Sequence, residues 1–599
     1  MDVIIGIDLG TTNSEVAIIR DGQPVVLPGD DGNPILPSIV GLDSAGRLLV
    51  GQAARNQYVL APERTVRSIK RKMGQDVTVM LGEQSFNPLE ISAIILRTLK
   101  ERAEKALGHA VTQAVITVPA FFNEGQREAT RVAGELAGLQ VMRIINEPTA
   151  AVLTYDPHPP ERQRLLVYDL GGGTFDVSIA QVEQGVVEIL ASHGDTQLGG
   201  DDFDQRLLDF VCDDFQTEYG IDLRHSLAAR SRLLAAVEEA KKRLSTEPVA
   251  TIDEAFIAEK NGVPLNLSIE VSRDEFERLI EPLLSKTLKC LEDALRDANL
   301  PAGQIDKVLL VGGATRTPLV HQLLTSRLGR PVHSEVNPDL AVALGAAVQG
   351  GLIAGIDVGP ILVDITPHTL GVESLGEVRG LPSNHCLSPI IERNTPLPAV
   401  RTEIYSTVYD GQDAAEIRIF QGEYDDTRMC QLVGEVTIRG LAPVPSPNSI
   451  LVRLDLDLNG ILRVTATERA TGLVKEVVID NMMERFKQRS RVNALERIEN
   501  LFTTLPAVAY ASTPAQLEEH ADEGDMAEIE DPDLRDAVGA AHALLDAASR
   551  VIPGAAAEDA AELQSLAVDL RSAIDRGSLD KIRRTSKEIE EIVFYLEDR

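Results

Sequence analysis

The sequence lacks most of the features that assign a chain to a class at once. It has only four cysteines in 599 residues, Cys212, Cys290, Cys386 and Cys430, and they lie far apart, without a C-x-x-C pair or a neighbouring histidine cluster. Neither a zinc site nor a disulfide framework is indicated, so a reducing cytosol is the expected setting. Acidic residues outnumber basic ones, which gives the chain a net charge of −34. That charge argues against a nucleic-acid partner, which needs a basic face on the protein.

Long apolar runs are missing too. The most apolar stretch, LAVALGAAVQGGLIAG at 340–355, is rich in Gly and Ala and too short to span a bilayer, which favours a buried helix and argues against a membrane partner. The chain opens on a strand pattern without the basic and apolar regions of a secretory signal, so we expect a cytoplasmic protein. At about 150 residues per domain, the length predicts about four domains.

One glycine-rich pattern occurs twice. IIGIDLGTTNSEVAIIRDGQPVVL, from residue 4, and LLVYDLGGGTFDVSIAQVEQGVVEI, from residue 165, both predict a strand ending in Asp-Leu-Gly, a tight turn, a second strand, a glycine turn and a third strand. The two copies are 161 residues apart, which aligns Asp8 with Asp169, Gly10 with Gly171, Asn13 with Thr174 and Glu15 with Asp176.

Bound phosphates would explain both copies. Glycines let backbone N–H groups approach phosphate oxygens without a Cβ in the way. Further donors are the side chains of Thr11, Thr12, Asn13 and Thr174. Carboxylates would repel bare phosphate, so Asp8 and Asp169 indicate an intervening cation such as Mg²⁺, which usually keeps several waters. Two such turns facing each other would clamp a triphosphate, whereas a duplicated turn without a ligand is the alternative.

A third glycine motif is VLLVGGATRTP at 308–318. It predicts an apolar strand, a turn at Gly312 and Gly313, and a helix entered at Pro318. A nucleoside could lie on these small residues under the Arg316 guanidinium, which can stack on a planar ring. An ordinary strand-to-helix turn with a surface arginine is the alternative. The chain has no G-x-x-x-x-G-K-[ST] motif, which excludes a P-loop NTPase.

Taken together, these motifs resemble the actin-like ATPase superfamily, and within it the DnaK-type seventy-kilodalton heat-shock chaperones. The matching segments are GIDLGTTNS (6–14), VITVPAFFNEGQREAT (115–130), RIINEPTAA (143–151), YDLGGGTFDVS (168–178), GDTQLGGDDFD (194–204) and VNPDLAVALGAAVQGG (336–351). The resemblance implies an α/β actin-like ATPase domain, ribonuclease H-like and duplicated, followed by a β-sandwich and a C-terminal helical bundle. The expected boundaries are a two-lobed nucleotide-binding domain at 1–355, a linker at 356–366, a peptide-binding sandwich at 367–480 and a helical lid at 481–599.

The resemblance also implies a slow ATPase that converts ATP to ADP and phosphate. Asp8 and Asp169 would hold Mg²⁺ and K⁺, Lys70 would neutralise charge on the transferred phosphoryl group, and Asp176 would help to organise the attacking water. The implied catalytic residues are Lys70, Glu147, Asp169, Thr174 and Asp176. The implied cofactor-binding residues are Gly10, Thr11, Thr12, Asn13, Gly171, Gly172, Gly173, Thr174, Gly199, Gly200, Glu238, Lys241, Ser245, Gly312, Gly313, Arg316 and Asp339.

Several of these residues have ordinary interpretations without the resemblance. Lys70, in SIKRKMG, would belong to a solvated face, and Glu147 would be an acidic residue favoured at a helix N-terminus. Glu238, Lys241 and Ser245 follow i, i+3, i+7 spacing and share one helix face. The resemblance assigns that face to adenosine, while a solvated helix remains the alternative for Glu238.

After residue 355 the pattern changes. Short alternating strands such as ILVRLDLDLNGILRVTATERATGLVKEVVI (450–479), with a hairpin signal at Asn459-Gly460, predict a β-sandwich. The resemblance implies that an extended peptide binds there by β-augmentation. The implied contacts are Val372, Ser374, Leu375, Tyr405, Val408, Ala415 and Ile417, although alternating aliphatics are ordinarily sandwich core. Beyond Asp480, helical spacing of Leu563, Leu566, Leu570 and Ile574 predicts a small bundle.

By the same resemblance, the expected function is that of an ATP-dependent molecular chaperone for extended hydrophobic segments of unfolded polypeptides. ATP binding and hydrolysis would switch the peptide affinity, and the expected partners include a J-domain co-chaperone and a GrpE-type nucleotide-exchange factor. The implied allosteric residues are Pro119, Arg127, Arg143, Asn146 and Asp364.

Two departures from the family pattern leave a second function open. Pro360 precedes the aliphatic run of the linker and cannot donate an N–H, so docking of the linker as an edge strand is expected to weaken. ERFKQRSRVNALERIENLF predicts one lid helix, but TTLPAVAYASTP interrupts it, and 518–533 holds nine acidic residues and no Lys or Arg. A nucleotide-binding scaffold with little peptide cycling is therefore the alternative to the chaperone.

Overall fold

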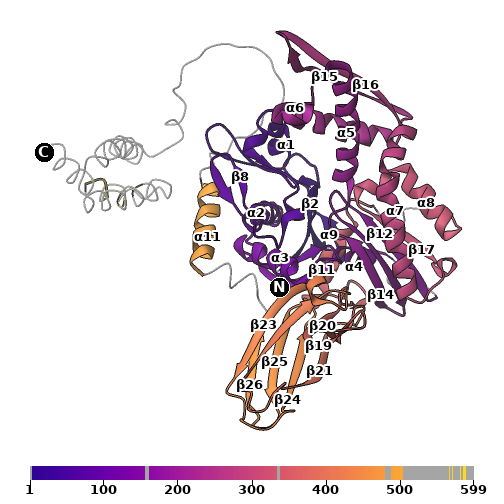
Figure 1. The fold of residues 1–599 in the computed structure, drawn as a ribbon. Helices are drawn as coiled ribbons and strands as arrows, with labels where there is room; N and C mark the ends of the chain where they lie inside the picture. The colour runs from indigo at the N-terminus through magenta and orange to yellow at the C-terminus, as the bar shows by residue number, and fades with distance from the viewer. Residues whose placement is uncertain are drawn as a thin grey trace. The chain divides into compact units, whose positions relative to one another are not determined.

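The computed structural model describes residues 3–155, 161–332, 337–478 and 488–503, with a few single positions between 566 and 587. The chain divides into two compact units, Met1–Pro506 and Ala507–Arg599, and every element named below lies in the first unit (Figure 1). The bundle predicted from Leu563 onward lies almost wholly outside the described residues.

Two sheets of matching topology form the N-terminal part of the first unit. The first sheet runs β11-β10-β1-β2-β3, with β4 beside β2, and the second runs β17-β12-β13-β14-β18. In each, three antiparallel strands follow one another, and a later strand, β10 or β17, joins in parallel beside the first of the three. The first sheet comprises β1 (Ile4–Leu9), β2 (Asn13–Arg20), β3 (Gln23–Val26), β4 (Leu36–Pro37), β10 (Gln113–Val118) and β11 (Gln140–Asn146). The second comprises β12 (Gln163–Leu170), β13 (Phe175–Glu183), β14 (Val186–Asp195), β17 (Lys307–Val311) and β18 (Ile361–Val363).

The strand registers confirm the sequence repeat residue by residue. Asp8 pairs with Glu15 across the first hairpin, and Asp169 pairs with Asp176 across the second. The residues aligned at an offset of 161 therefore occupy equivalent places. The chain uses one hairpin in two lobes, and each Asp-Leu-Gly turn lies at the end of its first strand.

Helices cover both sheets. Those of the first lobe are α1 (Gln52–Tyr58), α2 (Pro88–Leu107), α3 (Glu124–Leu136), α4 (Glu147–Val152) and α9 (Ala341–Ile353). Those of the second lobe are α5 (Gly200–Tyr219), α6 (Leu227–Leu244), α7 (Arg273–Asp297) and α8 (Pro318–Leu328), with the hairpin β15 (Val249–Lys260) and β16 (Val263–Ser272). The first lobe also holds a small sheet of β5 (Val40–Leu42), β6 (Leu48–Val50) and β7 (Thr65–Val66), and a hairpin of β8 (Val79–Leu81) and β9 (Gln84–Phe86).

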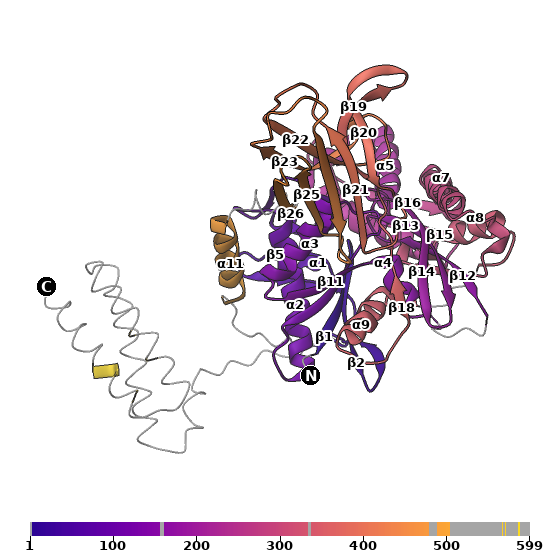
Figure 2. The ribbon, with the colours of Figure 1, turned by 90° about the horizontal axis from the view of Figure 1, so that it is seen from below.

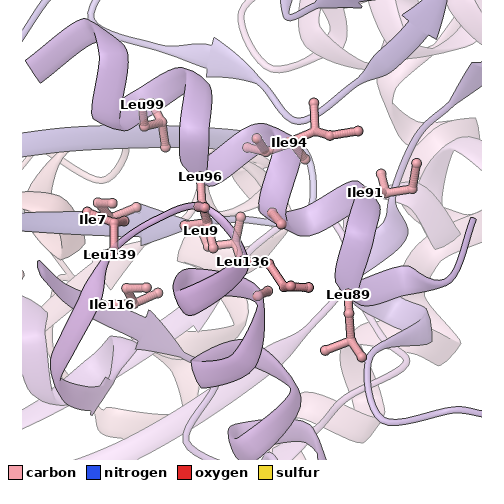
Figure 3. Packing of buried hydrophobic residues seen from close by; sticks show 14 of the residues in the cluster. Ile7, Leu9, Leu89, Ile91, Ile94, Leu96, Leu99, Ile116, Leu136 and Leu139 are labelled. Atoms are coloured by element: carbon pink, nitrogen blue, oxygen red, sulfur yellow. The ribbon is translucent and has the colours of Figure 1, made fainter. Parts of the chain in front are cut away.

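The core of the first lobe forms where α2 covers the sheet. Asn87 begins the helix with a capping box to Glu90, and Leu96 and Leu99 then face Ile7 and other apolar side chains of the sheet (Figure 3). Each of these buried side chains contributes roughly 1.5–3 kcal/mol through removal of its apolar surface from water. This core fixes β1, and with it the first glycine turn.

The apolar stretch at 340–355 is the buried helix predicted from its composition. α9 packs against β1, β2 and α4, and its small residues allow very close approach. A Cβ on Gly6 would lie 2.1 Å from the backbone nitrogen of Ala347, and one on Gly345 would lie 1.7 Å from the carbonyl oxygen of Ala150. Within the described residues, no helix has the length and apolar character needed to cross a membrane.

A β-sandwich follows, as predicted. Its sheets run β20-β19-β22-β23 and β21-β24-β25-β26. Alternate residues of β24, from Ile450 to Leu456, enter the core, and Asn459-Gly460 turns the chain into β25, with Gly460 at φ 81°. The strands are β19 (Leu370–Val378), β20 (Leu381–Ile391), β21 (Ala399–Ser406), β22 (Ala414–Gln421), β23 (Gln431–Arg439), β24 (Ser449–Leu456), β25 (Leu462–Glu468) and β26 (Val474–Val478).

The segment joining the lobes to the sandwich docks as an edge strand. β18 pairs in parallel with β14, and the N–H of Ile361 donates to the carbonyl of Gly185 at 2.8 Å. Pro360 lies one residue before the strand, where its missing N–H removes no bond of the ladder. Pro360 therefore does not prevent the linker from docking as an edge strand, and its effect on the strength of the docking stays a prediction.

One lid helix is present where the sequence predicts it. α11 (Gln488–Thr503) places Ala494, Ile498 and Leu501 in the core of the first lobe, against α2 and α3 (Figure 2). Arg497 forms an ion pair with the buried Glu90. The helix is thus packed as part of that lobe.

Candidate functional site

Both Asp-Leu-Gly turns face one cavity of about 720 Å³. The first turn contributes residues 10–13, and the second contributes Gly171, Gly172 and Thr174. Residues 312–317 of the third glycine motif complete the lining. Three motifs that are far apart in sequence therefore meet at one place, between the two lobes.

Most of the predicted site residues line this cavity. They are Asp8, Gly10, Thr11, Thr12, Asn13, Lys70, Glu147, Asp169, Gly171, Gly172, Thr174, Gly200, Glu238, Lys241, Ser245, Gly312, Gly313, Arg316 and Asp339. Of the predicted catalytic and cofactor-binding residues, those outside the lining are Gly173, Gly199 and Asp176.

Gly173 and Gly199 serve the packing of the turns. A Cβ on Gly173 would lie 2.6 Å from the methyl group of Thr11, and one on Gly199 would lie 2.5 Å from the backbone of Gly172. Glycine is thus needed where the second turn approaches the first turn and the start of α5. These two residues lie outside the lining but allow the close packing of the turns that form it.

Asp176 links the lobes. Its buried carboxylate accepts the backbone N–H groups of Ala120 at 3.1 Å and Phe121 at 3.0 Å, in the loop that follows β10. Burial, followed by the charge of Glu147, raises the pKa of Asp176 to about 7 despite these bonds. Asp176 thus contacts the first lobe. Its role in orienting the attacking water stays a prediction.

Lys70 is buried, contrary to its ordinary interpretation as part of a solvated run. Its side chain is 3% exposed and its ammonium pairs with the carboxylate of Glu147, the first residue of α4. The ammonium also lies 5.9 Å from the centre of the Phe122 ring. A 3₁₀ turn, η2 (Ile69–Lys72), carries the lysine into the cavity lining. A buried charge needs such a partner, because leaving it alone is costly.

The acidic residues beside Lys70 are in excess of its single charge. Asp8 accepts a hydrogen bond from the Thr117 hydroxyl at 2.9 Å, and Oδ2 of Asp169 is buried without a partner among the described residues. Burial, followed by the charge of Glu147, raises the pKa of Asp8 to about 7 and that of Asp169 well above its usual range. A bound divalent cation would remove this excess, so the donor set fits the predicted Mg²⁺.

Ligands for such an ion would come only partly from the protein. In the part of the chain that the structure describes, no three acidic, histidine or cysteine side chains converge into a ready-made metal site. Mg²⁺ commonly binds through one or two carboxylates together with waters and substrate phosphates. Asp8 and Asp169 are therefore the residues that would hold it.

The first turn presents unpaired hydroxyls. Oγ1 of Thr11 and Oγ1 of Thr12 are buried without partners among the described residues, although both residues line the cavity. A Cβ on Gly172 would lie 1.8 Å from the Thr12 hydroxyl oxygen. Glycine at position 172 therefore lets the second turn lie close to that hydroxyl. Buried hydroxyls normally have a hydrogen-bond partner, and phosphate oxygens would supply one here.

Residues of α6 also line the cavity. Lys241 donates to the carboxylate of Asp204 at 2.9 Å and to the carbonyl of Gly200 at 3.1 Å. Burial would raise the pKa of Glu238, but the charges of Lys242 and Arg55 outweigh it and lower that pKa to about 2. Glu238 is buried and pairs with Arg55 and Lys242 at 2.7 Å each, so the solvated alternative is wrong.

Arg316 also lines the cavity. Its guanidinium bonds to the Asp339 carboxylate at 2.5 Å and is 55% exposed. The predicted stacking of this guanidinium on a planar ring stays a prediction.

Sequence reasoning missed several lining residues. Asp201 and Asp204 stand in the matched segment GDDFD and could have been found there. Glu15 aligns with Asp176, so the repeat itself was a signal. Arg55, whose partner is Glu238 at 2.7 Å, comes from α1 and carried no motif.

Three of the predicted allosteric residues, Arg127, Asn146 and Asp364, form a connected route from the second glycine hairpin. Arg127 donates to the carbonyl of Ala120 at 2.8 Å and to Asn146 at 2.6 Å. Asn146 in turn donates to Asp364 at 3.1 Å, directly after β18. Since Ala120 also holds Asp176, the second glycine hairpin is joined to the linker.

Other members of the route lie around Asp364. Thr149, which sequence reasoning missed, reaches this carboxylate at 3.4 Å. Burial raises the pKa of Asp364 and lowers that of Arg143, which lies within reach of its charge. The carbonyl of Pro119 accepts the N–H of Phe122 and so closes the loop that follows β10.

The sandwich bonds to both lobes. Asp297, at the end of α7, accepts from Arg393 at 3.0 Å and from Asn394 at 3.1 Å. Asn123 of the first lobe donates to Gln431 at 2.7 Å. The sandwich thus meets each lobe through side chains as well as through the linker.

The predicted peptide contacts fall into two groups. Val372 and Ile417 are buried in the sandwich core, which is the ordinary place for strand aliphatics, and Ala415 and Tyr405 pack partly against it. The Tyr405 hydroxyl donates to Ser388 at 2.9 Å, and Ser374 donates to the carbonyl of Cys386 at 3.4 Å. Leu375 and Val408 are more than half exposed.

A comparison with protein families supplies one match. A family model described as Hsp70 protein matches residues 4–79 and 75–598. The matched ranges include both glycine turns, the cavity lining between them, the linker and the sandwich.

Proposed function

The chain belongs to the Hsp70 family, whose members are ATPases and ATP-dependent chaperones, and on that basis we propose that it hydrolyses ATP slowly to control its hold on unfolded polypeptides. The proposed clients are extended hydrophobic segments, bound by the sandwich. ATP would favour an open groove and ADP a closed one.

One observation carries the proposal: both glycine turns line a single cavity together with the buried pair Lys70 and Glu147. Backbone N–H groups of the two turns and the hydroxyls of Thr11 and Thr12 are suited to phosphate oxygens. Residues of α6 and Arg316 line the same cavity and would contact the nucleoside.

The residues of the chain would then act by positioning. Lys70 would stabilise the negative charge that spreads over the transferred phosphoryl group, while the turns hold the remaining phosphates. Asp8 and Asp169 would hold Mg²⁺, which supplies further neutralisation of phosphate charge when bound. No covalent nucleophile is needed, and slow turnover suits a timing function.

The route from Asp176 through Arg127 and Asn146 to Asp364 supports coupling to the sandwich. A switch of this kind works only if each ligand binds the two states of the protein differently. We further propose K⁺ as a second cation, a J-domain co-chaperone and a GrpE-type nucleotide-exchange factor as partners, and a bacterial-type cytoplasm as the setting.

Stimulated turnover tests the proposal. ATP hydrolysis by the full chain is measured alone, with an unstructured hydrophobic peptide, and with a J-domain protein. The proposal expects both additions to increase turnover severalfold. Basal hydrolysis that neither addition changes would instead support the nucleotide-binding scaffold.

A further inference from the structure

Two short segments from opposite lobes bind each other beside the cavity. The hydroxyl of Ser68 donates to Oδ2 of Asp201 at 2.5 Å, and Nη2 of Arg67 lies 3.4 Å from Oδ1 of the same carboxylate. Ser68 lies two residues before Lys70, and Asp201 belongs to the first turn of α5. The Asp201 carboxylate of the second lobe therefore binds both residues that directly precede η2, the turn that carries Lys70.

The other side of the turn is tied to the same part of the second lobe. Arg71 donates to the Asp202 carboxylate at 3.0 Å and to the carbonyl of Gln197 at 2.7 Å. The side-chain amide of Gln197 donates back to the carbonyl of Arg71 at 3.1 Å. Lys70 is thus bracketed by contacts to residues 197–202.

The backbone of Ser68 explains why its hydroxyl matters. Ser68 begins the turn η2 in the left-handed region, at φ 53° and ψ 32°, and its carbonyl accepts the N–H of Arg71 at 3.2 Å. This conformation is unfavourable for a residue with a Cβ. Such a residue adopts it only where surrounding contacts hold it in place. The bond to Asp201 is the contact that does so, and it aims the following residues into the site.

Asp201 carries the connection on to the second glycine turn. Its N–H donates to the carbonyl of Gly172 at 2.7 Å, while the N–H of Gly200 donates to Gly171 at 2.9 Å. A continuous path of hydrogen bonds therefore runs from Ser68 through Asp201 to the second glycine turn, which lines the same cavity as Lys70.

We infer that Ser68 is a positioning residue for hydrolysis: its bond to Asp201 sets Lys70 against the second glycine turn when the lobes are closed. This inference rests on the proposed ATPase activity. Binding of nucleotide uses the turns and α6, so loss of the Ser68 hydroxyl acts on the chemical step, for which small displacements of a charged group are costly.

Ser68→Gly is the direct test, because it removes the hydroxymethyl group and with it the bond to Asp201, while glycine adopts the left-handed region without strain. The rate constant of ATP hydrolysis in a single turnover is expected to fall about tenfold, with the dissociation constant for ATP changed less than about threefold and the melting temperature retained. Asp201→Asn keeps an acceptor oxygen for Ser68 and is expected to retain most of the rate, whereas Asp201→Ala loses it.

A double mutant separates coupling from independent damage. Ser68→Gly combined with Asp201→Ala is expected to be no slower than Asp201→Ala alone. Ser268→Ala is the matched control, because it removes a serine-aspartate bond of the same 2.5 Å length on the distant hairpin of β15 and β16. A wild-type rate for Ser68→Gly, or losses that multiply in the double mutant, overturns the inference. A wild-type chain that hydrolyses no ATP overturns the proposed function itself, and this inference with it.

Discussion

Lys70 and Glu147 form an ion pair inside the protein, with the lysine side chain 3% exposed and the glutamate 8% exposed. They come from two segments 77 residues apart, and both line the cavity between the glycine turns. The Lys70 ammonium is thus held at a fixed place in the cavity lining by the Glu147 carboxylate.

Lys70→Ala is expected to abolish hydrolysis while nucleotide still binds. The loss of one fixed charge beside the reacting phosphoryl group costs on the order of 100-fold in the chemical step, whereas the two turns keep the binding contacts. Single-turnover hydrolysis and equilibrium binding of ATP measure the two effects separately. Lys72→Ala, at the exposed lysine of the same turn, is the control and is expected to keep the wild-type rate. An unchanged single-turnover rate in Lys70→Ala would exclude the assigned role.

The linker should depend on the N–H of Ile361 and little on Pro360. Ile361→Pro removes the bond to the Gly185 carbonyl and is expected to reduce stimulation of turnover by peptide severalfold. Ile361→Ala keeps the N–H and serves as the control, because the Ile361 side chain is 69% exposed. Pro360→Ala is expected to behave as wild type. Equal stimulation in Ile361→Pro and Ile361→Ala would contradict strand docking as part of the coupling.

Asp364→Ala tests the route that joins the second hairpin to the linker. The substitution removes the acceptor of Asn146 and Thr149, so basal hydrolysis should persist while peptide and J-domain stimulation are lost. Asp357→Ala changes an exposed aspartate of the same segment and is expected to keep full stimulation. If both variants respond alike, the coupling runs elsewhere.

Acid should weaken the packing around His368. The ring donates from Nε2 to the carbonyl of Phe121 at 3.1 Å, and burial lowers its pKa from 6.5 to about 4 against the effect of that bond. The unfolded state therefore binds the proton more tightly, so this contribution is present above pH 6.5 and is lost as the pH falls toward 4.

Thermal unfolding at pH 7.5 and pH 5 measures the effect. His368→Gln is expected to lose less stability than wild type between the two pH values, by on the order of 2 kcal/mol, because glutamine does not titrate. His109→Gln, at an exposed histidine, should follow the wild type. Parallel losses in wild type and His368→Gln would contradict the assignment.

The sequence predicts those helices, strands and turns well that depend only on neighbouring residues. The repeat at an offset of 161 anticipates that Asp8 and Asp169 occupy equivalent strand ends, because alternating aliphatics and a glycine turn specify a hairpin by themselves. The buried helix α9, with its small residues, and the turn at Asn459-Gly460 are likewise specified by local sequence.

Contacts between distant segments are what the sequence hides. The run around Lys70 is typical of a solvated face, and its burial depends on Glu147, which belongs to another element. Val372 and Ile417 alternate as any sandwich strand does, so periodicity does not separate core from groove. The left-handed conformation of Ser68 has no sequence signature, and the partner of its hydroxyl, Asp201, lies 133 residues further along the chain.

Calorimetric titration of the full chain with MgATP and MgADP tests the central claim most directly, since two duplicated turns that grip a triphosphate must give a heat of association. The account predicts saturable heat at about one site per chain for each nucleotide, weakened when Gly171 is replaced by a bulky residue. No detectable heat for either nucleotide in the presence of magnesium would contradict it.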